Sequence, residues 1–276
     1  MAGAKKTKLD TAVIAAAGYG SRLLPMTLHQ PKAMMAVADR PLIHYVVDQL
    51  AAGGVRNFIV VINPAFQAVR KYIDYQLQQK EWAGCRFAII EKKSASFADS
   101  VLAADGRIGK KHFIAVACDD LIDDSRPPFA SLAAIFNRYH QPIVVVREIS
   151  RKDIPNYGVI AGTAKTKDIW SVADVVEKPK PAKAPSKLGA ISVYILPPEI
   201  FRFIKLTQKI HSGPKEVTVI DVLKLYLKEG GHLLGWVFRG QHFDGGSRLG
   251  LLKASIYYGA KHPAFGQSFK KYLRSL

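Results

Sequence analysis

The sequence predicts a three-layer α/β/α fold built on a mixed central sheet. Over roughly residues 9–150, apolar runs of strand length alternate with amphipathic helical stretches, a pattern typical of parallel strands joined by crossover helices. After residue 150 the segments shorten and alternate apolar with polar side chains, which favours additional antiparallel strands in the C-terminal half. A chain of 276 residues can bury roughly three quarters of its unfolded surface, enough for one α/β domain with appended elements.

The first half is expected to supply the parallel core. Its strands are expected at residues 11–17, 58–62, 86–90, 113–117 and 143–146. Its helices are expected at residues 41–53, 67–79, 96–105 and 129–139. In the first of these helices the apolar residues recur at helical spacing, Pro41 suits the first turn, and Gly53 and Gly54 end it.

The second half is expected to add strands that flank the core sheet and helices that close the fold. Strands are expected at residues 157–161, 169–176, 188–196 and 233–238. Helices are expected at residues 199–209, 219–228 and 249–259. The stretch from Lys178 to Lys187 is rich in proline and lysine, so it is expected to be a surface loop.

The charge and hydropathy of the chain narrow the classes of protein it can belong to. The net charge of +18 would suit nucleic acid, an anionic membrane surface or phosphorylated substrates. The basic residues are spread along the chain in pairs, with no single basic helix and no aromatic RNA-binding signature, so a solvated basic surface is favoured over a nucleic-acid footprint. No apolar run approaches the ~20 residues of a membrane helix, and no apolar leader follows Met1, which predicts a cytoplasmic protein without membrane contact.

The cysteines and histidines give no sign of a disulfide or a metal site. Cys85 and Cys118 lack metal-ligand spacing and are expected to be two buried thiols. The histidines form no plausible metal set and are expected at the surface or with satisfied hydrogen bonds. The main ones are His29, His112, His211 and His242.

The turn after the first strand has the features of a polyphosphate-binding loop. The apolar run ends in Gly18 and Gly20, Arg22 follows, and Lys32 comes ten residues later. Glycine allows close approach of the backbone to an anion, and the two cations can neutralise it. A dinucleotide-binding turn would need a third glycine where Leu23 stands, and no Gly-Lys-Ser/Thr follows for a Walker A loop. A tight turn without a ligand would not explain the two cations.

Six short motifs follow one another along the chain. They are Gly18-Tyr-Gly-Ser-Arg-Leu-Leu-Pro, Pro31-Lys-Ala-Met, Asp39-Arg-Pro-Leu-Ile, Tyr157-Gly-Val-Ile, Glu177-Lys-Pro and Asp244-Gly-Gly. Together they resemble the signature of the sugar-1-phosphate nucleotidylyltransferases, most closely the bacterial UTP–glucose-1-phosphate uridylyltransferases, and the resemblance covers nearly the whole chain.

The resemblance implies a Rossmann-like nucleotidyltransferase fold and a reaction. A phosphate oxygen of glucose 1-phosphate would attack the α-phosphorus of a nucleoside triphosphate, expected to be UTP, giving UDP-glucose and pyrophosphate. Residues 1–276 would form one domain, with a nucleotide-binding core at 9–150, a sugar-phosphate-binding half at 151–250 and a helical segment at 251–276. Family members also suggest a homodimer or homotetramer.

The resemblance also assigns roles to individual residues. The expected catalytic residues are Arg22, Lys32, Asp119 and Lys178. The expected nucleotide-binding residues are Ala16, Ala17, Gly18, Gly20, Ser21 and Glu91. The sugar phosphate is expected to bind at Tyr157, Gly158, Glu177 and Lys178, and Mg²⁺ at Asp119 and Asp244. Taken alone, Asp119 could be an ordinary loop carboxylate, and Asp244 could simply start a turn.

One segment departs from the family pattern. The uridylyltransferases read the base with a glutamine followed by a Gly-Leu-Gly-His turn, and this chain has Glu91 there, with Ser96 and Ala98 in place of the glycines. A carboxylate lacks the N–H donors that uracil carbonyls accept from an amide. Two interpretations therefore stay open: an active nucleotidyltransferase, or a relative of altered specificity or without activity that senses sugar phosphate or nucleotide.

Overall fold

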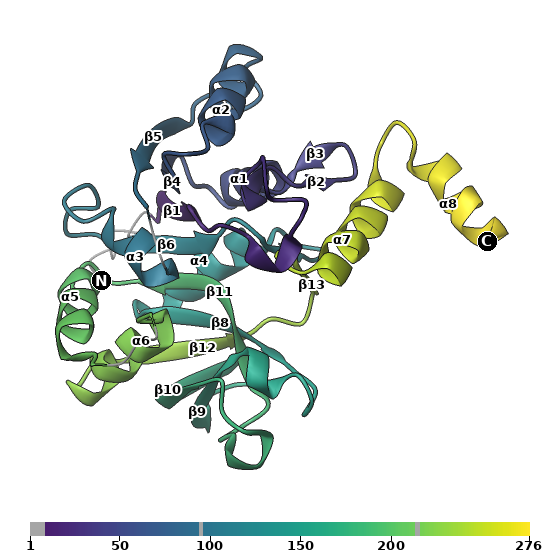
Figure 1. Ribbon diagram of the computed structural model, residues 1–276. Coiled ribbons are helices and arrows are strands. Elements are labelled where there is room, and N and C mark those ends of the chain that lie inside the picture. Colours follow the sequence, from purple (N-terminus) through teal and green to yellow (C-terminus); the bar gives the residue numbers. More distant parts are fainter. Residues whose placement is uncertain (1–8, 94–95, 213–215) are drawn as a thin grey trace, which may run out of the picture.

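The computed structural model describes residues 9–93, 96–212 and 216–276 (Figure 1). Within these ranges nine strands form one mixed sheet in the order β5-β4-β1-β6-β11-β8-β12-β10-β9. The strands are β1 Thr11–Ala16, β4 Asn57–Ile62, β5 Arg86–Glu91, β6 Phe113–Ala117, β8 Ile143–Glu148, β9 Gly158–Ala164, β10 Ile169–Glu177, β11 Leu188–Leu196 and β12 Leu233–Val237.

The sheet is parallel on one side and mostly antiparallel on the other. Strands β5, β4, β1 and β6 run parallel to one another. Strand β11 is antiparallel to both β6 and β8, whereas β12 runs parallel to β8. The predicted mixed sheet is therefore confirmed.

Helices cover both faces of the sheet, as the sequence predicted. Alternate residues of β1 separate the two cores, with Ile14 in one and Val13 in the other. Four helices pack on the Ile14 side: α1 Leu42–Ala52, α2 Ala68–Gln78, α4 Pro128–Tyr139 and α7 Arg248–Lys261. Three pack on the Val13 side: α3 Phe97–Leu102, α5 Ile200–Ile210 and α6 Val219–Lys228.

One strand lies elsewhere than expected. The segment 188–196 was expected to flank the core sheet, and that placement is wrong, because β11 lies at its centre between β6 and β8. Its side chains are almost all buried because both faces of a central strand are covered by helices. The strands β9 and β10 do occupy an edge, as predicted.

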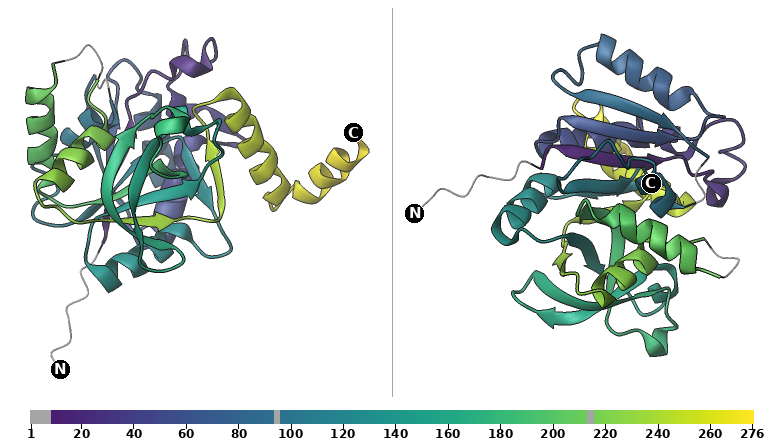
Figure 2. Two further views of the ribbon diagram at one scale, coloured as in Figure 1. Left: turned by 90° about the horizontal axis from the view of Figure 1, so that it is seen from below. Right: turned by 90° about the vertical axis from the view of Figure 1, so that its left-hand side faces the viewer.

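Several short elements were not predicted. The strands β7 Asp120–Asp123 and β13 Gln241–Asp244 pair as an antiparallel ribbon, and β2 Ala36–Val37 pairs with β3 Arg40–Pro41. Short 3-10 helices lie at η1 Ser21–Leu23, η2 Lys32–Met34, η3 Ile154–Asn156 and η4 Pro181–Lys183. Figure 2 shows a last helix, α8 Gly266–Ser275, projecting from the rest of the molecule.

No helix among the described residues is long and apolar enough to cross a membrane. The Pro/Lys-rich stretch 178–187 is a loop on the surface that contains η4, as predicted. Lys5 and Lys6, one of the basic pairs along the chain, lie outside the described residues.

Candidate active site

The loop after β1 brings the backbone of its second glycine close to Lys32. Gly20 has a φ of 66°, and a Cβ there would lie 3.0 Å from both the Cβ of Lys32 and the Cγ2 of Thr27. Position 20 therefore requires glycine, because the backbone has a positive φ and a side chain would press against Lys32 and Thr27. Gly18, in contrast, has nothing within 4 Å of its own virtual Cβ, so this part of the loop is open to a ligand.

The remaining predicted nucleotide-binding residues of this region flank the open backbone. Ala16 ends β1 and Ala17 follows it, both buried, and Ser21 begins η1. The parallel neighbour β6 ends two residues before Asp119. The carboxyl ends of parallel strands share one edge of a sheet, which is where open α/β sheets place ligands.

Lys32 and Asp119 form a buried ion pair at this edge. The Nζ atom of Lys32 lies 2.6 Å from Oδ2 of Asp119, and the two side chains are only 18% and 7% exposed. Burial would lower the pKa of Lys32, but the charge and hydrogen bond of Asp119 outweigh it and raise the pKa above its ordinary value. Lys32 therefore stays protonated and available to an anion.

Arg22 and Asp244 form a second, more open ion pair. The Nη1 atom of Arg22 lies 3.0 Å from Oδ2 of Asp244, and the Arg22 side chain is 64% exposed. Burial raises the pKa of Asp244, Asp120 and Asp119 add to the shift, and Arg22 opposes it. A cation placed beside Asp244 would thus relieve repulsion among carboxylates.

Asp119 and Asp244 converge at Gly246. A Cβ on Gly246 would lie 2.3 Å from Oδ2 of Asp119 and 3.0 Å from Oδ1 of Asp244, so glycine leaves space between the two carboxylates. The amide of Gly245 donates to the carbonyl of Asp119 at 2.8 Å and fixes the turn. Two carboxylates facing one small space are the hard oxygen donors that Mg²⁺ prefers, so these residues fit the predicted metal.

The predicted sugar-phosphate residues also lie together, where β9 begins and β10 ends. Gly158 pairs with Glu177 across the two strands, and the amide of Lys178 donates to the carbonyl of Tyr157 at 3.1 Å. The Nζ atom of Lys178 lies 3.4 Å from Oε1 of Glu177. A Cβ on Gly158 would lie 2.4 Å from Cγ1 of Ile220 and 3.2 Å from Oε2 of Glu177, so glycine is required for packing.

Electrostatic contacts connect this cluster to the carboxylates. Burial raises the pKa of Glu177, and the charge and hydrogen bond of Lys178 oppose the shift. Burial also raises the pKa of Tyr157, to which Asp120 and Asp244 contribute. Burial raises the pKa of Tyr194 well above its usual range, and Asp120 and Glu177 both add to it. The two parts of the candidate site are therefore close enough to influence one another's ionisation.

Glu91, at the end of β5, has a partner that the sequence did not predict. The Nη2 atom of Arg70, on α2, lies 2.7 Å from Oε1 of Glu91. The strand registers align Glu91 with Ile62 and Ile62 with Ala16, which places Glu91 about 10 Å across the sheet from the loop. No periodicity or motif around Arg70 indicated this contact, because it depends on how α2 packs.

The segment after Glu91 is described only in part. Residues 94 and 95, which belong to the altered stretch 91–100, lie outside the described residues. Ser96 is the N-cap of α3, and its side chain accepts a hydrogen bond from the amide of Asp99 at 3.2 Å. Ser96 therefore has a local structural role in place of the family's glycine.

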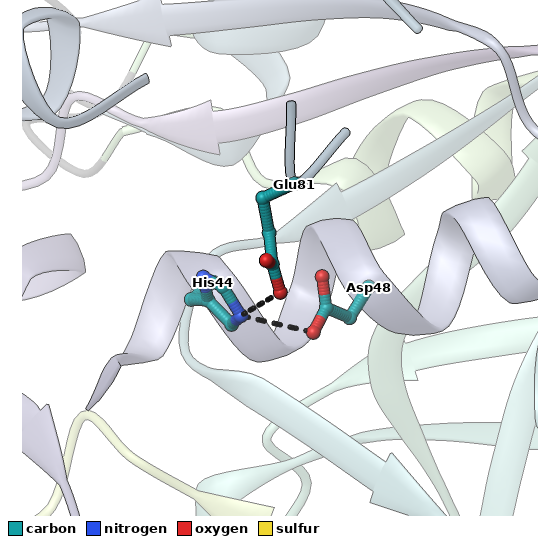
Figure 3. Close-up of side chains that lie close together, drawn as sticks. All are labelled: His44, Asp48 and Glu81. Carbon is teal, nitrogen blue, oxygen red and sulfur yellow. Dashed lines mark ion pairs between the residues drawn. The ribbon is translucent and has the colours of Figure 1, made fainter. Parts of the chain in front are cut away.

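A second cluster of metal-ligand residue types lies on and beside α1. The Nε2 atom of His44 lies 3.0 Å from Oδ2 of Asp48 and 4.0 Å from Oε1 of Glu81 (Figure 3). The guanidinium of Arg40 contacts His44 and Glu81 and lies 3.6 Å from Asp48. Because this cation already pairs with both carboxylates, the cluster is a structural ion network.

Comparisons with known proteins identify the family. Residues 11–260 match the family described as Nucleotidyl transferase. A Streptococcus pyogenes protein named UTP–glucose-1-phosphate uridylyltransferase 1 is 30% identical, covering 98% of this chain and 95% of its own length. A Staphylococcus epidermidis UTP–glucose-1-phosphate uridylyltransferase is 29% identical, covering 98% and 99%.

Solved structures give the same result. A UDP-glucose pyrophosphorylase complexed with UDP-glucose superposes with a TM-score of 0.83 at 28% identity, covering 92% of this chain and 100% of its own. A structure described as a UTP-bound UGPase from Acinetobacter baumannii shares the fold, with a TM-score of 0.85 at 24% identity and coverage of 98% and 100%. On sequence, fold and the placement of its charged residues, this chain belongs to the Nucleotidyl transferase family.

Proposed function

We propose that this protein is an enzyme that transfers a uridylyl group from UTP to glucose 1-phosphate, producing UDP-glucose and pyrophosphate. The observation that carries the proposal is the convergence of Lys32, Arg22, Asp119 and Asp244 beside the open loop after β1. The names of the full-length relatives support the same substrates.

The nucleotide would bind along the loop. The amides near Gly18 and Ser21 would hold the β- and γ-phosphates together with Arg22, because N–H groups and a guanidinium neutralise a polyanion. Lys32 would leave Asp119 and contact the α-phosphate, where negative charge develops as the phosphate oxygen of the sugar attacks in line. In this reaction no covalent bond forms between the enzyme and the nucleotide.

Mg²⁺ is the proposed cofactor, and Asp119 and Asp244 would hold it. When bound, it supplies positive charge that offsets the negative charge of the reacting phosphates. The carboxylates become available to it because Lys32 and Arg22, their present partners, move to the phosphates.

The sugar phosphate would bind where β9 begins and β10 ends. Glu177 would accept hydrogen bonds from sugar hydroxyls, and Lys178 would pair with the phosphate. The hydrogen bond from the Lys178 amide to the Tyr157 carbonyl supports this placement, because it holds the two segments in one turn.

The pair Glu91 and Arg70 would read uracil. Glu91 would accept a hydrogen bond from the N3–H of uracil, and Arg70 would donate one to a uracil carbonyl. The two side chains together would supply the acceptor and the donor that a single glutamine amide supplies in the family pattern. The 2.7 Å contact between the two side chains supports this division, because it orients the guanidinium beside the carboxylate.

The remaining features of the proposal concern the whole chain. We propose one catalytic domain, with the nucleotide at residues 9–150 and the sugar phosphate at 151–250; the continuous sheet supports this.

A homodimer or homotetramer is supported by the apolar side chains exposed on α7, namely Leu249, Leu252 and Ile256. A cytoplasmic location is supported by the free thiols of Cys85 and Cys118.

The test is a coupled pyrophosphate-release assay with glucose 1-phosphate, Mg²⁺ and each nucleoside triphosphate in turn. UTP is expected to give the highest rate, and Lys32→Ala is expected to lower kcat/KM by about 10²–10³, the usual effect of removing one transition-state contact. If no triphosphate gives a rate above that of Lys32→Ala, the protein is not this enzyme. Binding of UTP without turnover would then favour a nucleotide sensor.

A further inference from the structure

A third carboxylate lies beside the two candidate metal ligands and has no part in the proposed reaction. Asp120 follows Asp119 directly and lies opposite Asp244 in the β7–β13 ribbon. Its side chain is only 13% exposed. Like charges directly opposite on paired strands destabilise a sheet, so the partly buried pair Asp120 and Asp244 requires compensation.

Both carboxylate oxygens of Asp120 are bound by the protein. Oδ1 lies 2.6 Å from Nε2 of His242, a side chain that is 2% exposed. Oδ2 accepts a hydrogen bond from the amide of Ser192 at 3.0 Å.

Arg147 fixes the orientation and tautomer of His242. Its Nη1 atom lies 3.1 Å from Nδ1 of His242. A guanidinium can only donate hydrogen bonds, so Nδ1 must accept, and the imidazole proton is then on Nε2, facing Asp120. The three side chains form a directed chain of hydrogen bonds from Arg147 through His242 to Asp120.

We infer that Arg147 and His242 hold Asp120 out of the metal site, so that a divalent cation meets two carboxylates instead of three. Magnesium sites that act on phosphates use one or two carboxylates and leave the other positions to phosphate oxygens and water. A third carboxylate would compete with those phosphates and add negative charge where two polyanions must meet. His242 and Arg147 are therefore positioning residues. The inference rests on the proposed function for the identity of the metal ligands.

The partners of Asp120 differ from those of the two ligands. Arg22 is an exposed side chain that can turn from Asp244 to a phosphate. His242 is buried within β13, and the amide of Ser192 belongs to the central strand β11. Asp120 thus keeps its partners when substrates arrive, whereas the two ligands exchange theirs.

The test measures binding of free Mn²⁺ to the full chain by electron paramagnetic resonance at pH 8, without nucleotide. His242→Phe removes the donor while keeping a ring, and it is expected to bind Mn²⁺ at least tenfold more tightly, because affinity rises with the number of charged ligands. His242→Gln retains an N–H donor and is expected to stay within about twofold of wild type. The double variant His242→Phe with Asp120→Asn is expected to bind Mn²⁺ no more tightly than the wild type, because the third carboxylate is absent.

Asp120→Asn alone provides the second measurement, and it keeps the inference testable if His242→Phe does not fold. Its Mn²⁺ affinity is expected to stay within about twofold of wild type, because Asp120 is not a ligand. A tenfold loss in Asp120→Asn, or no tightening in a folded His242→Phe variant, would overturn the inference. These binding measurements do not depend on turnover, so they separate its failure from failure of the proposed uridylyl transfer.

Discussion

At the scale of single residues, the sequence predicted which charged groups belong to the site but not which of them pair. Arg22 and Lys32 were indicated by their spacing from two glycines, and Asp119 and Asp244 by the resemblance to the nucleotidylyltransferases. Their pairing depends on how a turn near residue 246 approaches β6, which no local pattern encodes. For the same reason Arg70 was missed, because its partner lies 21 residues away on another element.

The contact between Arg70 and Glu91 predicts a defect that affects UTP binding more than turnover. Arg70→Ala removes the proposed donor to uracil, and KM for UTP is expected to rise about tenfold, since losing a hydrogen bond to a charged group costs about 1.5 kcal/mol. The matched control is Arg239→Ala, because Arg239 also makes an exposed ion pair, 2.7 Å from Asp168. Equal steady-state constants for the two variants would refute the role of Arg70.

The environment of Asp244 predicts that this carboxylate lowers stability at neutral pH. Folding raises its pKa, so the folded chain holds the proton more tightly than the unfolded chain, and stability falls as pH rises through the raised value. Asp244→Asn is expected to increase the melting temperature at pH 7 while removing most activity.

The gain in Asp244→Asn is expected to shrink as the pH falls toward the ordinary pKa of 3.8. Thermal unfolding of the variant and the wild type in a buffer series from pH 8 to pH 4 measures this difference in melting temperature. Asp168→Asn, which removes the carboxylate of an exposed ion pair, should give no gain at any pH. A gain for Asp244→Asn that grows on acidification would contradict the assignment.

At the scale of elements, the positions of helices and strands along the chain were predictable where an apolar pattern was long enough. The order of the strands in the sheet was not predictable. The period of apolar residues identified α1 and β4 almost to their ends. The same information could not place β11 at the centre of the sheet, because strand order depends on contacts between distant segments. The ribbon of β7 and β13 is only four residues on each side, too short for a periodic signal.

The start of α6 gives a prediction at this scale. The Thr218 side chain accepts a hydrogen bond from the Asp221 amide at 3.2 Å, and Asp221 Oδ2 accepts one from the Thr218 amide at 2.9 Å. Thr218→Ala is expected to lower the free energy of unfolding by about 1 kcal/mol, whereas Thr218→Ser keeps the cap. Urea denaturation of the two variants tests this. Equal losses would mean that the methyl group, and not the hydroxyl, is responsible.

At the scale of the whole molecule, one continuous sheet joins the strands that carry the two parts of the site. Strand β11 pairs with β6, which leads to Asp119, and with β8, which carries Arg147. The sequence predicted one domain with a mixed sheet, but not that β11, from the second half of the chain, would lie between two strands of the first half. This continuity predicts that both parts unfold together.

Single-tryptophan variants can test this prediction. One variant retains Trp82, which packs on the side of α1, and the other retains Trp236 on β12. Within each variant, the urea midpoint from tryptophan fluorescence is expected to coincide with the midpoint from circular dichroism. Ile195→Ala in β11 should lower the free energy of unfolding of both variants by the same amount, about 2–5 kcal/mol for a buried large-to-small change. Two separate transitions would show that the chain is not one cooperative unit.

The internal ion pairs also have a thermodynamic consequence for ligand binding. A metal ion arriving alone must displace Lys32 and Arg22 from their carboxylates without giving these cations a new anion. A triphosphate arriving alone must draw the same cations away and leave the carboxylates of Asp119 and Asp244 uncompensated. When both ligands bind, the phosphates accept the displaced cations and the metal ion compensates the carboxylates. Each ligand should therefore raise the affinity for the other, and the two affinities should rise by the same factor. Calorimetric titration of either ligand, with and without the other, would measure this reciprocal coupling.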